Sequence, residues 1–111
     1  MVQQITRKDL MNVQIDQQVL NVAVQQITLA AGQTAPKHLH PCPVVGYIAS
    51  GSILFQIEGE EIVILHEGDA FYEPKNKTIL HFDNASKETP VTFIAFYLKE
   101  KDEENIRILE E

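Results

Sequence analysis

Residues 32–51 read GQTAPKHLHPCPVVGYIASG and carry the most informative pattern in the chain. Its second half, Val44 to Ser50, is rich in β-branched and aromatic residues, which is typical of a buried strand. Its first half carries His38 and His40, and residues two apart in an extended chain project to the same face. We therefore expect a β-rich surrounding in which two imidazoles point toward one place.

Further strands are predicted on both sides of this stretch. In residues 52–57, Ile53, Phe55 and Ile57 alternate with more polar positions, which is the two-residue period of a half-buried strand. Similar patterns, separated by turn signals, occur at residues 20–30, 62–65, 70–72, 79–82 and 91–98. Many short strands at such spacing indicate an all-β sandwich or barrel.

Length and composition restrict the class of protein. The 111 residues and 12.6 kDa fit a single domain over 1–111, with an N-terminal arm of about 1–18 and a charged tail of about 99–111. The tail is expected to be solvated, or else to dock on a partner subunit. A net charge of −7 argues against nucleic acid or an anionic membrane as partner.

The location is predicted from what the chain lacks. No apolar run approaches the ~20 residues that cross a bilayer, and the start has no secretory pattern. Cys42 is the one cysteine, so no internal disulfide forms. These features predict a cytoplasmic protein.

The histidine pair is the first candidate for chemistry. Neutral imidazole nitrogens are ligands for transition metals, and His38 and His40 would offer two of them from one strand. Taken alone, the spacing favours a simple surface pair over a metal site.

A wider pattern around this pair resembles the cupin superfamily. The first cupin motif reads Gly, five residues, His-x-His, three or four residues, Glu, six residues, Gly. Here Gly32, His38, His40 and Gly51 are in register, while Val44 stands at the glutamate position.

The second cupin motif resembles residues 68–84, which read GDAFYEPKNKTILHFDN. Gly68 and Pro74 match it. Asn76 stands in place of a glycine, and asparagine also accepts left-handed backbone. Ile79 occupies the histidine position, and His81 follows two residues later. Asn84 lies one residue beyond its expected place, and the resemblance covers about residues 20–98.

The resemblance implies a double-stranded β-helix, a jelly-roll barrel with a metal inside. It implies a ligand set of His38, His40 and His81, with His81 reaching the ion through a shift or bulge of its strand. The cofactor would be a divalent ion of iron, manganese, nickel, copper or zinc. A small-molecule ligand would bind beside it, and the chemistry would be that of a metal-dependent dioxygenase or isomerase.

Alternatives stand beside this interpretation. His81 could instead bind Asp83 at the rim, and the pocket could be metal-free and serve a non-catalytic ligand-binding or interaction module. Glu73 is expected to face outward, although it could act as a general acid or base if it were buried near the ion. His66 is expected to be solvated. The residues expected around the substrate pocket are Cys42, Val44, Tyr47, Gln56 and Ile79.

The resemblance also implies an oligomer. Small barrels of this kind often pair edge strands, and a short chain gains core by doing so. We expect a homodimer, with the apolar residues of the N-terminal segment, Val13, Ile15, Val19 and Leu20, at its interface.

Overall fold

The computed structural model describes residues 4–109, and within them the chain forms strands and no helix. The strands are β1 (Asn21–Leu29), β2 (His38–Leu39), β3 (Val44–Ser50), β4 (Ser52–Ile57), β5 (Val63–His66), β6 (Ala70–Glu73), β7 (Ile79–Asn84), β8 (Val91–Lys99) and β9 (Arg107–Ile108). The predicted strands are confirmed to within one or two residues at each end. Only the short strands β2 and β9 were not predicted.

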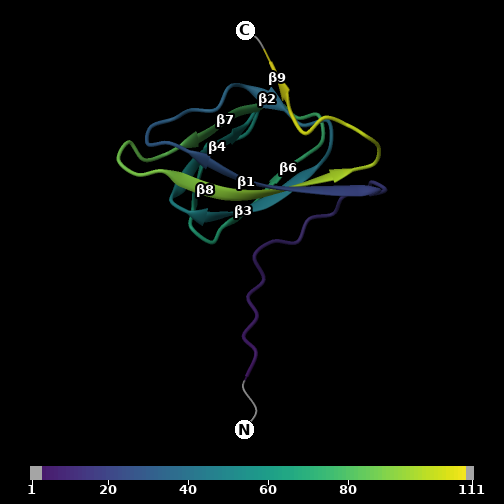
Figure 1. Cartoon of the computed structure of the whole chain (residues 1–111), viewed down its shortest axis with the longest axis horizontal. Helices are drawn as coiled ribbons and strands as arrows, with labels where there is room; N and C mark the ends of the chain where they lie inside the picture. Colours follow the sequence, from purple (N-terminus) through teal and green to yellow (C-terminus); the bar gives the residue numbers. More distant parts are fainter. Residues whose placement is uncertain (1–3, 110–111) are drawn as a thin grey trace.

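Two antiparallel sheets form the body of the molecule. One has the strand order β1-β8-β3-β6, and the other has the order β5-β4-β7-β2-β9. Consecutive strands thus alternate between the sheets at several points, as in a jelly roll, and Figure 1 shows the two layers stacked around a common interior. The predicted all-β jelly-roll barrel is confirmed.

The core lies between the sheets because alternate residues of each strand point inward. In β8, Val91, Phe93, Ala95 and Tyr97 are buried, whereas the residues between them are partly exposed. Phe82 of β7 packs edge-on against Phe93, with ring centroids 4.7 Å apart. This aromatic packing joins the two sheets and leaves the polar residues described below at one end of the interior.

Among the turns with left-handed backbone, two bear directly on the sequence analysis. Gly51, with φ of 86°, links β3 to β4, and a side chain there would also collide with the carbonyl of Pro90. Asn76 has φ of 61° and replaces the expected glycine in the turn between β6 and β7. Asparagine tolerates this conformation, as the sequence indicates.

The two ends of the described chain differ in how they contact the barrel. Residues 4–20 form no strand and run away from the barrel at their N-terminal side (Figure 1). The C-terminal segment folds back so that β9 pairs with β2, and the Leu109 amide donates to the Lys37 carbonyl at 2.9 Å. Most of residues 101–108 are nevertheless exposed. No helix in residues 4–109 has the length and hydropathy to span a membrane.

Candidate functional site

The histidine pair lies inside the barrel. β2 is held between β7 and β9, and His38 is the residue directly opposite Ile79 of β7. His40 follows β2, and its carbonyl accepts a hydrogen bond from the Asn76 amide at 2.9 Å. Both imidazoles are 4% exposed, so the predicted inward projection of the pair is what the structure has.

Glu73 completes the cluster from the opposite sheet. It ends β6, is 3% exposed, and lies directly opposite Val44 of β3. The prediction that Glu73 faces outward is therefore wrong. Phe71, two residues earlier, points into the core, and the two-residue period of the strand carries Glu73 to the same face.

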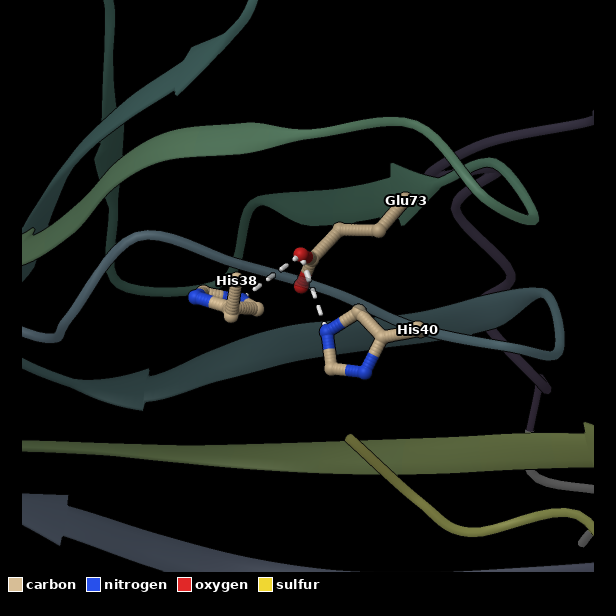
Figure 2. A group of neighbouring side chains, drawn as sticks. All are labelled: His38, His40 and Glu73. Carbon is tan, nitrogen blue, oxygen red and sulfur yellow. Dashed lines mark hydrogen bonds and ion pairs between the residues drawn. The ribbon is translucent and has the colours of Figure 1, made fainter. Parts of the chain in front are cut away.

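The three side chains converge on one point (Figure 2). Oε2 of Glu73 lies 3.1 Å from Nε2 of His40 and 3.5 Å from Nε2 of His38. One ligand atom from each of the three residues lies within 4.8 Å of the others. The two rings are nearly perpendicular, with centroids 5.0 Å apart.

Hydrogen bonds to the backbone fix the tautomer of each ring. Nδ1 of His38 lies 2.8 Å from the Pro36 carbonyl, and Nδ1 of His40 lies 2.7 Å from the Asn105 carbonyl. A carbonyl only accepts, so both Nδ1 atoms carry the donated hydrogen. In a neutral ring each Nε2 then presents a lone pair toward the Glu73 carboxylate, which is also an acceptor. Such a group requires a shared cation, either a metal ion or a proton.

The short distance between Glu73 and the two histidines also shifts the pKa values of His40 and Glu73. Burial lowers the pKa of His40, but the hydrogen bond and negative charge of Glu73 and the Asn105 carbonyl together raise it above its usual 6.5. Burial raises the pKa of Glu73, but hydrogen bonds from His38 and His40 and their charges bring it below its usual 4.5. In the absence of a metal, the cluster therefore favours an imidazolium beside a carboxylate.

A cavity of about 130 Å³ opens beside the cluster. His38, His40, Glu73 and Tyr97 line its polar end. Its other walls are apolar, from Ile27, Leu29, Val44, Phe82, Phe93 and Ala95, and Ile106 of the C-terminal segment also borders it. The barrel therefore holds a small apolar chamber with ionisable groups at one end.

His81 is not part of this cluster. Its side chain is 47% exposed, and Nδ1 lies 2.9 Å from Oδ2 of Asp83. The reason is a bulge: Gln56 pairs with His81 but Ile57 pairs with Ile79, so Leu80 is an extra residue in β7. The bulge reverses the alternation after Ile79, so Phe82 points inward and His81 outward. The expected bulge exists but turns His81 away from His38 and His40.

The residues expected around the pocket divide into three kinds. Val44 lines the cavity. Cys42 and Ile79 are fully buried in the core without bordering it. Tyr47 is 40% exposed on the outer face of β3, and the Gln56 amide donates to the Glu60 carbonyl, so neither reaches the interior cavity.

Two residues of the site had no signal in the sequence. Asn105 and Ile106 lie in the charged C-terminal segment and reach the site only because β9 pairs with β2. The side-chain Oδ1 of Asn105 is buried without a hydrogen-bond partner among residues 4–109. Local sequence patterns do not reveal such long-range pairing.

Solved structures of similar fold include enzymes of different activities. They include the DMSP lyase DddQ from Ruegeria pomeroyi, with 21% identity, a TM-score of 0.67, and coverage of 78% of this chain and 42% of that one. An oxalate oxidase in complex with the substrate analogue glycolate has 22% identity, a TM-score of 0.67, and coverage of 79% and 46%.

A cupin-like protein from Thermotoga maritima has 21% identity, a TM-score of 0.68, and coverage of 80% and 65%. The chain thus spans about half the length of the two enzymes and about two thirds of this protein. At these identities the likeness shows the fold alone.

The sequence itself shows the family. No curated protein matches the chain. The family model of the cupin domain matches residues 25–97, which run from the middle of β1 to the inward-facing Tyr97 of β8 and include His38, His40 and Glu73. The chain belongs to the cupin family.

Proposed function

We propose that this protein binds a divalent transition metal through Nε2 of His38, Nε2 of His40 and the carboxylate of Glu73. The observation that carries the proposal is the pair of Nδ1 hydrogen bonds, which leave both Nε2 lone pairs facing a buried carboxylate. Three acceptors gathered away from water are costly unless a cation joins them. The donor set of two histidines and one carboxylate suits such an ion.

The donor set also indicates a class of chemistry. Two histidines and one carboxylate that leave coordination positions open are the ligands of non-haem ferrous oxygenases, and manganese, nickel, copper and zinc accept the same donors. When bound, such an ion would supply Lewis acidity toward an oxygen atom of a substrate, or a place to activate dioxygen. We propose metal-dependent turnover of a small molecule, with an oxygenase reaction as the first to test.

The residues of the chain have defined parts in this proposal. The carbonyls of Pro36 and Asn105 orient the two imidazoles, as outer-shell acceptors do in metal sites. Glu73 provides the one negative charge, and the apolar walls exclude water from the ligand. The DMSP lyase and the oxalate oxidase among the similar structures act on small molecules, which supports a small-molecule ligand here.

A second candidate is a metal-free ligand-binding module. The 3.1 Å contact between His40 and Glu73 supports it, because a proton shared there would satisfy the same groups. In that case the cavity would hold a ligand without converting it. Ligand binding would then raise the melting temperature of the metal-free protein.

Metal content separates the two candidates. Untagged protein is purified, analysed for bound metals, and then titrated with Fe²⁺, Mn²⁺ and Zn²⁺. The variant His38→Ala/His40→Ala should lose metal, and the control His66→Ala/His81→Ala, whose imidazoles lie outside the cluster, should keep it. Equal metal retention by both variants would refute the ligand assignment.

We further propose that two copies of the chain associate through β1. In the described chain β1 pairs only with β8, so its other edge is free, and Val22 and Val24 on it are 53% and 56% exposed. A long edge strand with exposed valines is a template for pairing. Val19 and Leu20 are also exposed and would extend the interface along the N-terminal segment. Light scattering that finds a monomer at working concentration would contradict this.

A further inference from the structure

A row of three inward-facing residues crosses one sheet beside the cavity. Val44 of β3 lies directly opposite Glu73 of β6 on one side and Tyr97 of β8 on the other. All three are buried and line the cavity. With neighbouring strands about 4.8 Å apart, the backbones at Glu73 and Tyr97 are separated by about 10 Å, with an apolar side chain between.

Tyr97 brings an unpaired hydrogen-bond donor into this chamber. The residue is 3% exposed, and its ring centroid is 5.8 Å from that of His40. Among residues 4–109 no hydrogen bond to its hydroxyl is found, and the hydroxyl oxygen is not one of the fully enclosed polar atoms, so a ligand can reach it. Because Tyr97 lines the cavity and its hydroxyl has no partner among these residues, an oxygen atom of a ligand in the cavity is a suitable acceptor for it.

The proton of this hydroxyl is retained at neutral pH. The pKa of a tyrosine hydroxyl is ordinarily about 10, so it keeps its proton at pH 7. The phenol is therefore a donor, and its natural partner is an acceptor oxygen.

The net charge of the metal ion, Glu73 and the two histidines determines which ligand charge the site can neutralise. A divalent ion with the carboxylate of Glu73 has a net charge of +1, and neutral histidines add nothing. No lysine or arginine of the described residues lines the cavity. A monoanion would neutralise the site, whereas a dianion would leave an uncompensated charge against apolar walls, which is costly.

The size of the chamber limits the rest of the ligand. An apolar cavity of 150 Å³ holds benzene, so a cavity of about 130 Å³ takes a ligand of about six non-hydrogen atoms. Its apolar walls suit a hydrocarbon body.

From these observations we propose that the site takes a small aliphatic monoanion with an oxygen head, of the short-chain monocarboxylate class. The head lies between the metal position and the Tyr97 hydroxyl, and the hydrocarbon body fills the apolar end. Tyr97 is then a specificity-determining residue, because it recognises the acceptor oxygen. This inference rests on the proposed metal site.

Calorimetry of the zinc-loaded protein tests it, with butyrate, succinate and butanol as probes. We expect butyrate to bind at least about tenfold more tightly than either succinate or butanol. Tyr97→Phe should weaken butyrate binding about 10- to 100-fold, since a hydrogen bond to a charged group is lost. Tyr47→Phe, on the exposed outer face, is the matched control and should leave binding unchanged.

The outcomes separate this inference from the proposed function. Bound zinc is measured before each titration, and a protein that retains no zinc refutes the metal site and this inference with it. If zinc is retained but succinate binds as well as butyrate, or Tyr97→Phe binds butyrate like Tyr47→Phe, the inference alone is overturned. Thermal melts of both variants confirm that the barrel is folded.

Discussion

Glu73→Gln separates metal binding from barrel stability. The substitution preserves the shape of the side chain and removes the single negative charge of the cluster. Loss of an outer-shell partner typically weakens metal binding 10- to 100-fold, and Glu73 is a direct ligand on our proposal. We therefore expect the dissociation constant for Zn²⁺ or Fe²⁺ to rise by at least about 100-fold, or about 2.7 kcal/mol.

The metal-free barrel should tolerate the same substitution. Both Nδ1 atoms donate to carbonyls, so each neutral Nε2 needs a donor, and the glutamine amide supplies one at the position where Oε2 lies 3.1 Å from His40. A neutral hydrogen bond replaces the ion pair, and the free energy of unfolding at pH 7.5 should change by no more than about 1 kcal/mol.

Competition titrations against a chelator and urea unfolding of metal-free protein measure the two quantities. Glu67→Gln, in the exposed turn before β6, is the matched control. Metal affinity within threefold of the unchanged protein would refute the role of Glu73. A second variant restores a carboxylate from the facing strand. Val44 lies directly opposite Glu73, so Val44→Glu/Glu73→Gln should recover much of the metal affinity that Glu73→Gln loses.

Three further predictions concern pH, the cavity and the C-terminal segment. In metal-free protein, protonated His40 stabilises the fold through its contact with Glu73. This contribution to the free energy of unfolding is fully present below about pH 6.5, and it is lost as the pH rises through the raised pKa of His40 in the folded protein. The Glu73 contribution is complete above about pH 4.5 and is lost as pH falls through the lowered pKa of Glu73. Urea unfolding from pH 3 to 9 should show both losses, and bound metal should reverse the upper slope. Ile106 borders the cavity, so Ile106→Ala should enlarge it and allow longer monocarboxylates such as hexanoate to bind, with binding measured by calorimetry. A chain ending at Glu103 lacks the Asn105 carbonyl and should bind metal about 10- to 100-fold more weakly, whereas unchanged affinity would mean that this carbonyl does not orient His40.

The sequence predicts the fold well because strand periodicity is local. Residues 52–57 show the alternation, and β4 has the same bounds. Asn76 adopts the left-handed backbone expected of it, because asparagine itself tolerates this conformation. Each of these features depends on a few consecutive residues.

The site is less predictable because it depends on pairing between distant strands. Leu80 is a bulge only because β7 pairs with β4 in a shifted register, and nothing in residues 79–84 alone reveals that shift. Asn105 reaches His40 across 65 residues of chain. Glu73 was within reach of local reasoning, because Phe71 anchors its strand face, but its partner Val44 could be identified only from the sheet register.

That register explains how a cupin barrel can lose its motif glutamate and still keep a carboxylate beside its histidines. Residues directly opposite on antiparallel strands have Cβ atoms about 4.5–5.5 Å apart. The long side chain of Glu73 can therefore bring its carboxylate to a point that a glutamate at position 44 would also reach, and Oε2 lies 3.1 Å from His40. Valine at position 44 then leaves space, and the cavity opens against it. Val44 and Glu73 are thus complementary across one strand pair: Glu73 brings the carboxylate from β6, and Val44 on β3 forms an apolar wall of the cavity.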